Sequence, residues 1–220
     1  MATLEDLITD AVMKTLRKRE ADEVIKIGVS ARHVHLSEKD LYALFGEGYE
    51  LHKKKELMGG QFAAEECVTI VSPSLRTIEN VRVLGPLRKQ SQIEVSRTDT
   101  FKLKVSPPVR PSGELKGSAP MAIVGPKGSI FLNECCIIAN RHIHLPPYLA
   151  DKYGVKDNDM VDVEVQTGKP TKFYNVQVRV HESFTPEMHI DTDDANACAL
   201  KTGDVIRIIT KKLSAIKTKD

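Results

Sequence analysis

The sequence RHVHL at residues 32–36 is repeated almost unchanged as RHIHL at residues 141–145. Each copy follows an apolar run rich in β-branched residues, which is typical of a β-strand. Side chains two residues apart on a strand share one face, whereas the same spacing on a helix would separate them by roughly 200°. The repeat therefore predicts two strands that each deliver a pair of imidazoles to one side.

The repeat extends beyond these five residues, because GVSARHVHLS aligns with IIANRHIHLP. Helix-start signals follow both copies: Ser37 with Asp40 three residues later, and Pro146 with Pro147. The helices expected after the two copies span about residues 37–45 and 147–153. Strand, paired histidines and helix thus form a unit used twice. An internal duplication with a twofold relation would bring the two pairs to face one another across one cleft; convergent local structure is the alternative.

The paired histidines indicate a metal site, since they account for four of the seven histidines in the chain. Imidazole pairs suit zinc, cobalt, nickel or iron, although a single pair could equally be partly exposed strand histidines. Glu94, between apolar Ile93 and Val95, is a candidate third ligand, with a solvent-facing glutamate as the alternative. His189 precedes an acidic cluster able to cap a helix and to hydrogen-bond an imidazole.

Length and composition predict a soluble protein of one large or two small domains, since the chain has 220 residues of which 41% are hydrophobic. A net charge of +2 with mixed signs argues against nucleic acid as a partner. Acidic residues interrupt the N-terminal segment, so neither an export signal nor a membrane span is expected. Without CxxC pairs, reduced and mostly buried thiols are expected at the four cysteines, which are Cys67, Cys135, Cys136 and Cys198.

Residues 1–20 have apolar positions at helical spacing and predict an amphipathic helix, which would pack on the domain or dock on another protein. From Ile25 onward, short segments rich in Val, Ile and Thr alternate with turn signals. Many short strands with few helices favour β-barrels or β-sandwiches. The expected strands lie at about residues 67–73, 78–87, 91–99, 101–108, 121–132, 160–168, 173–181 and 205–212.

Five segments, RHVHLS, VRVLGPLRKQSQIEVSRTDT, RPSGELKGS, NRHIHL and EMHIDTDDANA, together resemble the PduL-type phosphate acyltransferases, also called phosphotransacylases or phosphate propanoyltransferases. The resemblance runs in order from about residue 25 to residue 209. One departure is Asp194, where the DTDEAN phrase of the family has glutamate. Aspartate caps a helix equally well, so this departure puts little in doubt.

The resemblance implies a mainly β fold of two small β-barrels related by internal duplication, with short capping helices. The implied parts are an amphipathic N-terminal peptide (1–20), a first barrel (22–31 with 140–210), a second barrel (32–139, with a hairpin insertion near 46–66) and a tail (211–220).

The site implied by the resemblance holds two zinc ions. One ion would be bound by His33 and His35, with an open position for the sulfur of coenzyme A. The other would be bound by Glu94, His142, His144 and His189. Arg88 would be the catalytic residue that binds inorganic phosphate, and the residues near coenzyme A would be Val29, Ser30, Ala31 and Asn196.

The activity implied by the resemblance is transfer of a short acyl group between coenzyme A and inorganic phosphate, giving an acyl phosphate. Direct attack by phosphate is expected, with a covalent route through Cys135 or Cys136 as the alternative. A zinc hydrolase of phosphate esters or amides, and a non-catalytic microcompartment protein with a structural metal, are alternative functions. The resemblance further implies a homodimer, a role in propanediol degradation, and either the cytoplasm or a bacterial microcompartment lumen, where residues 1–20 would contact a shell or lumen partner.

Overall fold

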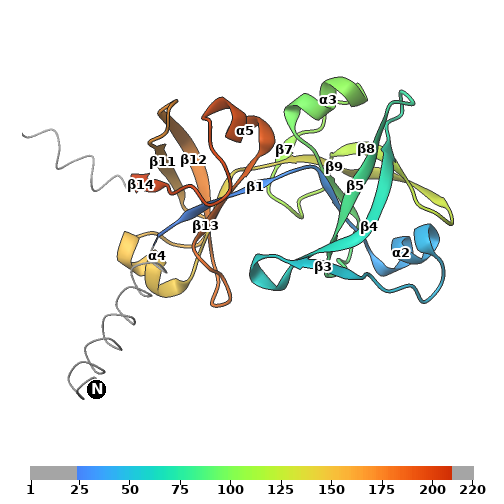
Figure 1. The fold of residues 1–220 in the computed structure, drawn as a ribbon, viewed down its shortest axis with the longest axis horizontal. Coiled ribbons are helices and arrows are strands. Elements are labelled where there is room, and N and C mark those ends of the chain that lie inside the picture. The colour runs from blue at the N-terminus through green and yellow to red at the C-terminus, as the bar shows by residue number, and fades with distance from the viewer. Residues whose placement is uncertain (1–23, 210–220) are drawn as a thin grey trace, which may run out of the picture. The chain divides into compact units, whose positions relative to one another are not determined.

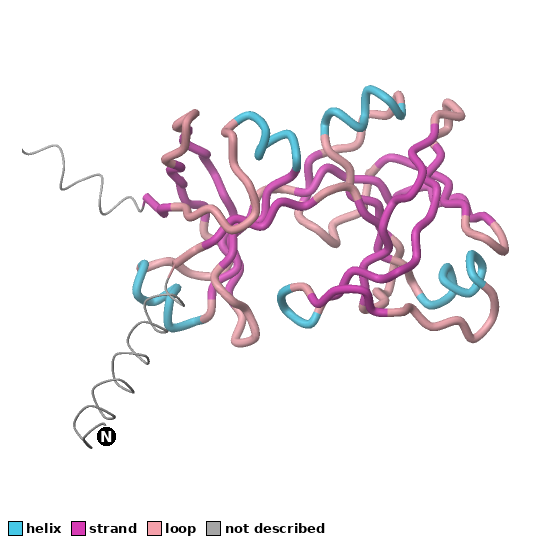
Figure 2. Tube along the Cα trace, in the orientation of Figure 1, coloured by secondary structure: helices cyan, strands magenta, loops and turns pink. Residues whose placement is uncertain are grey.

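The computed structural model describes residues 24–209, and most of its regular structure is β-strand (Figures 1 and 2). The strands are β1 (Lys26–Ser30), β2 (His33–His35), β3 (Lys53–Glu56), β4 (Phe62–Val71), β5 (Thr77–Gly85), β6 (Gln92–Glu94), β7 (Val109–Arg110), β8 (Ala119–Val124), β9 (Ser129–Ala139), β10 (His142–Leu145), β11 (Met160–Val165), β12 (Thr171–Val180), β13 (Glu187–Asp191) and β14 (Arg207–Ile209). The helices are α2 (Glu38–Phe45), α3 (Arg97–Leu103), α4 (Pro147–Tyr153), α5 (Thr192–Ala197) and the 3₁₀ turn η1 (Met58–Gly60). The expected N-terminal helix and C-terminal tail lie outside the described residues.

One sheet has six strands in the order β1-β13-β10-β12-β11-β14. A bridge between Lys26 of β1 and Val205, just before β14, joins the two ends of this order and closes the sheet into a barrel. Alternate residues of the strands fill the interior, as Val161, Val163 and Val165 of β11 do. Closure leaves the strands without long free edges.

The other sheet has the order β3-β4-β5-β2-β6-β9-β7. Because β8 pairs with both β4 and β9, the pairing returns on itself through β4, β5, β2, β6, β9 and β8. Val34, between the two histidines of β2, lies fully buried in the core of this sheet with Val83 and Ile93. The structure therefore confirms a mainly β fold of two small barrels.

The described chain divides into two compact units. The C-terminal unit comprises residues 24–28, 142–189 and 198–209, and the middle unit comprises residues 29–141 and 190–197. Helix α5 thus belongs to the middle unit, although it directly follows strand β13, most of which belongs to the C-terminal unit. None of the helices between residues 24 and 209 combines the length and apolar composition needed to cross a membrane.

Strand pairing in the two units repeats the same pattern around the two histidine strands. Strand β2 runs parallel to β5 and antiparallel to β6, and β10 runs parallel to β12 and antiparallel to β13. In the antiparallel ladders, His33 pairs with Glu94 and His142 pairs with His189. Glu94 and His189 therefore occupy equivalent positions, and this equivalence supports duplication over convergent local structure.

The expected strand at residues 101–108 is wrong, because its first residues form the end of helix α3. The Ser96 hydroxyl accepts from the Asp99 backbone N–H, and the Asp99 carboxylate accepts from the Ser96 backbone N–H, which completes a capping box. Asp99, Thr100 and Leu103 are buried at helical spacing. The capping box and the burial of these side chains stabilise a helix here, although the alternation of Phe101 and Leu103 would also suit a strand. The helices expected after the two histidine phrases are confirmed as α2 and α4.

Gly125 allows the turn between β8 and β9 to lie close to the end of helix α2. A Cβ at this position would lie 2.6 Å from the Leu44 carbonyl oxygen, which is backbone and cannot rotate away. We expect Gly125→Ala to lower the free energy of unfolding by about 1–3 kcal/mol, as for other overpacked sites. Urea unfolding monitored by circular dichroism measures this change. Gly168→Ala is the matched control, because nothing lies within 4 Å of its added Cβ; equal losses in both variants would contradict the prediction.

Candidate active site

The first candidate metal-binding group is formed by His33, His35 and Glu94 in the middle unit. Both histidines project from the same face of β2, and the β2–β6 register sets Glu94 opposite His33. The His33 Nε2 atom lies 3.4 Å from Glu94 Oε2, and the two imidazole centroids are 5.0 Å apart. One ligand atom from each of the three residues lies within 4.8 Å of the others. The predicted pairing of imidazoles on one strand face is confirmed.

The second group is formed by His142, His144 and His189 in the C-terminal unit. The three ring centroids are 4.8 to 5.0 Å apart, so the imidazoles form a nearly equilateral triangle. Phe184 stacks on His144 with its centroid 4.1 Å away and shields that ring. This group has the same construction as the first, with an imidazole in the place of the carboxylate.

Buried nitrogen atoms without a hydrogen-bond partner indicate that these side chains bind a ligand such as a metal ion. Four buried side-chain nitrogen or oxygen atoms within residues 24–209 have no hydrogen-bond partner, and three of them are His35 Nδ1, His144 Nδ1 and His189 Nε2. Burying such an atom without a partner costs about 1–3 kcal/mol. His189 Nε2 lies 3.4 Å from Glu187 Oε2, but not in hydrogen-bonding geometry. Imidazole nitrogens and a carboxylate oxygen are ligands of zinc, so both groups fit this metal.

The charge states suit ligation at neutral pH. Burial lowers the pKa of His35 to about 3 and the pKa of His144 to about 2, with neighbouring positive charges acting in the same direction. Both rings are therefore neutral at pH 7 and retain a free lone pair. Burial opposes the charged form of Glu94, but His33 outweighs this effect and holds the carboxylate pKa well below its usual range. Glu94 is thus ionised, as a metal ligand must be.

The ring of His33 is oriented by the backbone just before it. Its Nδ1 atom lies 2.9 Å from the Ala31 carbonyl oxygen and 3.3 Å from the Ser30 hydroxyl. Donation from Nδ1–H to this carbonyl fixes the orientation of the ring, so that Nε2 faces Glu94. Ser30 and Ala31, predicted to lie near coenzyme A, therefore contact a candidate ligand directly.

An arginine–aspartate ion pair, which was not predicted from the sequence, accompanies each histidine strand. Arg32 contacts Asp99 at 2.7 Å, and Arg141 contacts Asp194 at 3.1 Å. Each arginine opens the repeated phrase, and each aspartate stands five residues after the third member of the group. The repeated Arg was the signal available in the sequence. Asp194, the departure from the family phrase, is the acidic member of the second pair.

Arg88 is joined to the first group by a short chain of hydrogen bonds. Its Nη1 atom donates to Ser112 Oγ at 3.0 Å, and Ser112 Oγ donates to Glu94 Oε1 at 2.8 Å. The positive charge of Arg88 also contributes to the lowered pKa of His35. An anion bound by this guanidinium would thus lie beside the first group. Ser112 stands in the quoted RPSGELKGS segment, but nothing in its spacing indicated a role.

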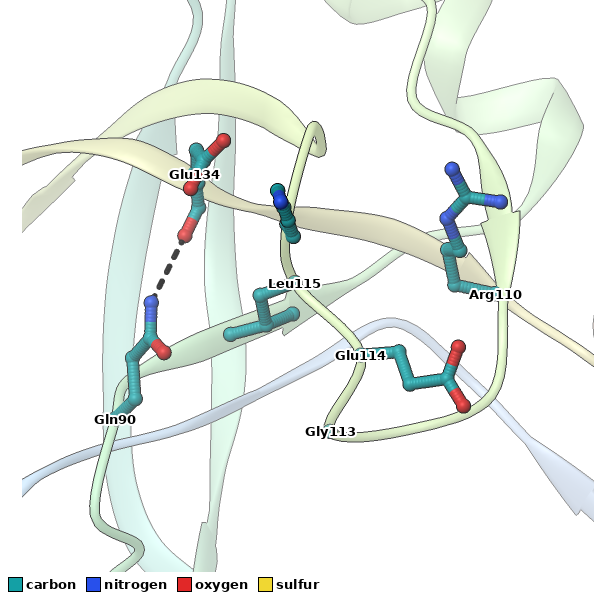
Figure 3. A pocket seen from close by; sticks show the side chains of 7 residues that line it. Gln90, Arg110, Gly113, Glu114, Leu115 and Glu134 are labelled. Atoms are coloured by element: carbon teal, nitrogen blue, oxygen red, sulfur yellow. Dashed lines mark hydrogen bonds between the residues drawn. The ribbon is translucent and has the colours of Figure 1, made fainter.

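The loop that carries Ser112 lines a hollow (Figure 3). The hollow measures about 570 Å³, and Figure 3 shows Arg110 and Glu114 on one side of it and Gln90 and Glu134 on the other. The Gln90 amide donates to the Glu134 carbonyl oxygen at 3.3 Å. No residue of either candidate group lines this hollow, so it is separate from the ligand cluster.

The remaining predicted residues lie in the middle unit. Val29 is the penultimate residue of β1, the strand that leads to the first group, and Asn196 is exposed on helix α5. The resemblance placed Glu94 with His142, His144 and His189, whereas the structure groups its carboxylate with His33 and His35 because of the β2–β6 register.

Comparison with known proteins identifies the family. A family model described as phosphate propanoyltransferase matches residues 26–201, which include both candidate groups and Arg88. The chain belongs to the phosphate propanoyltransferase family. Two similar relatives, each named phosphate propanoyltransferase, come from Lachnoclostridium phytofermentans (56% identical, covering 93% of this chain and 97% of the relative) and Thermotoga maritima (52% identical, covering 92% and 99%). The phosphate propanoyltransferase family is a family of acyltransferase enzymes, and the resemblance inferred from the sequence is confirmed.

Proposed function

We propose that this chain transfers a short acyl group between coenzyme A and inorganic phosphate, with two zinc ions held by the two histidine groups. The observation that carries the proposal is the duplicated pair of strand imidazoles, each grouped with a third ligand and each including one buried, neutral ring with an unpartnered Nδ1, at His35 and His144. His33, His35 and Glu94 would hold one ion, and His142, His144 and His189 the other. When bound, zinc supplies Lewis acidity toward oxygen and a soft partner for sulfur.

Arg88 would bind phosphate in this reaction. A guanidinium presents two parallel N–H donors that match two phosphate oxygens, and its charge offsets the repulsion between phosphate and coenzyme A. Ser112, hydrogen-bonded to both Arg88 and Glu94, would keep the guanidinium beside the first group. A phosphate oxygen then attacks the thioester carbonyl carbon, a C–O bond forms, and the C–S bond breaks to release the thiolate.

Direct transfer is favoured over a covalent cysteine intermediate. Cys135 and Cys136 are fully buried, burial raises the pKa of Cys135 to about 12, and the pKa of Cys136 is raised by the same cause. Thiolates are the nucleophilic form of cysteine, so neither residue is activated at neutral pH. The structure confirms that all four cysteines are free and that Cys135, Cys136 and Cys198 are buried.

Replacing Cys67, Cys135, Cys136 and Cys198 one at a time by serine tests this route. We expect each variant to keep kcat within a few-fold of the parent, because no thiol takes part in direct transfer. The measurement is steady-state release of coenzyme A, with bound metal determined in the same samples. Loss of turnover at one position with unchanged metal content would establish the covalent route instead.

The activity itself is tested by thiol release from acetyl-, propanoyl- and butanoyl-coenzyme A, with and without phosphate. Phosphate-dependent release with formation of acyl phosphate supports the proposal. Release that needs no phosphate would favour the zinc hydrolase, which uses water as nucleophile at the same ligands. A structural zinc site is closed and usually contains cysteine, whereas no cysteine belongs to either group, so the non-catalytic alternative is disfavoured.

We also propose that the protein is a homodimer and that residues 1–20, which lie outside the described residues, direct it into a microcompartment. Sedimentation of the full chain tests whether it is a dimer. Fusion of residues 1–20 to a fluorescent protein tests the second, in cells that assemble a microcompartment. Diffuse fluorescence there would leave the cytoplasm as the location.

A further inference from the structure

Gln92 is a buried polar residue next to the first candidate group, and all of its amide atoms are engaged. It lies on β6, is 1% exposed, and pairs across the ladder with His35. Its Nε2 atom donates to Glu94 Oε1 and, at 2.9 Å, to Ser112 Oγ. Its Oε1 atom accepts from the Gly113 backbone N–H at 2.8 Å. The amide orientation is therefore specified at both ends.

The two carboxylate oxygens of Glu94 have different contacts. Oε1 accepts from both Gln92 and Ser112, whereas Oε2 faces His33 Nε2 at 3.4 Å. A carboxylate held through one oxygen presents the other in a fixed direction. Outer partners of this kind commonly change metal affinity by 10- to 100-fold.

The equivalent position in the C-terminal unit supports this interpretation. Glu187 stands two residues before His189, as Gln92 stands two residues before Glu94, and its Oε2 lies 3.4 Å from His189 Nε2. A polar side chain therefore precedes the third member of each group by two residues and lies close to it. Gly28 leaves room for this carboxylate, because a Cβ there would lie 2.7 Å from Glu187 Oε1.

We propose that Gln92 is a positioning residue, which orients Glu94 toward the metal and ties the Ser112–Gly113 loop to it. The proposal rests on the proposed metal role of Glu94. It assigns Gln92 no contact with substrate. Because Ser112 also holds Arg88, the same amide links the orientation of the metal ligand to that of the phosphate-binding guanidinium.

The test compares Gln92→Met, which keeps the side-chain length and removes every donor, with Gln92→Glu, which keeps an acceptor and removes the donors. Gln90→Met is the matched control, since Gln90 lies two residues earlier and its amide donates to the Glu134 carbonyl (Figure 3) instead of to Glu94. Zinc affinity of the full chain is measured by competition with a chromogenic chelator. We expect both Gln92 variants to bind one of the two ions, the one held by the group that contains Glu94, about 10- to 100-fold less tightly, and the control to match the parent.

Thermal unfolding of the metal-free variants separates positioning from folding. Folded Gln92 variants with parental zinc affinity overturn the proposal. Failure of both variants to fold also overturns it, because it would show that Gln92 is needed for the barrel itself. A parent protein that binds no zinc would instead refute the proposed metal site, so the two failures are distinguishable. Restored turnover of a folded variant at saturating zinc would further support positioning, since substrate contacts are unchanged.

Discussion

Removal of metal by a strong chelator, followed by dialysis, should abolish phosphate-dependent release of coenzyme A, and added zinc should restore it. His35 and His144 are neutral and Glu94 is a deeply buried anion, so these side chains present lone pairs suited to binding a metal. Loss of Lewis-acid stabilisation worth several kcal/mol corresponds to a rate loss on the order of 1000-fold or more. Bound metal and activity are measured on the same samples.

Circular dichroism of the metal-free protein is the control for folding. A folded protein that stays fully active with only trace metal would contradict the two-zinc proposal.

Single replacements of the proposed ligands test the two metal sites independently of chelation. We expect His35→Ala and His144→Ala each to lose bound metal and activity, since each removes a ligand from a different group. His52→Ala serves as the matched control, because His52 lies outside both groups and pairs with Glu66.

Arg88→Ala should lower kcat/KM for phosphate by about 100- to 1000-fold, the range seen when a single donor to a developing negative charge is removed. Bound metal should not change, because Arg88 acts on the anion and not on the metal. Arg88→Lys should recover only part of the loss, since an ammonium cannot form two parallel N–H contacts. Steady-state kinetics with phosphate varied at saturating acyl-coenzyme A provide the measurement.

Arg82→Ala is the matched control, because Arg82 stands on β5, the strand that precedes the Arg88 loop, and donates to the carbonyl oxygens of Ala64 and Glu65. We expect its effect on the KM for phosphate to be small. An Arg88 variant with an unchanged KM for phosphate and reduced zinc content would contradict the assigned role. Such a result would make Arg88 part of the support for the metal group.

The histidine pairs were predictable because they depend on local rules. Residues two apart on a strand share a face, so His33 and His35 had to project together once their segment was extended. The helices after the two phrases follow from local start signals, the Ser37 cap for α2 and the prolines at the start of α4. Helix α3 was missed because its capping box lies inside a segment with alternating apolar residues, and the packing of Leu103 decides between the two structures.

Side-chain alternation and helix capping involve only near neighbours, so the sequence was enough to predict two strands with two imidazoles each and a mainly β fold. The third member of each group depends instead on contacts between distant segments. His33 and Glu94, or His142 and His189, meet through strand register, and register is set by the packing of whole sheets. The same holds for Ser112 and Gln92, whose hydrogen bonds join a loop to a strand about twenty residues away.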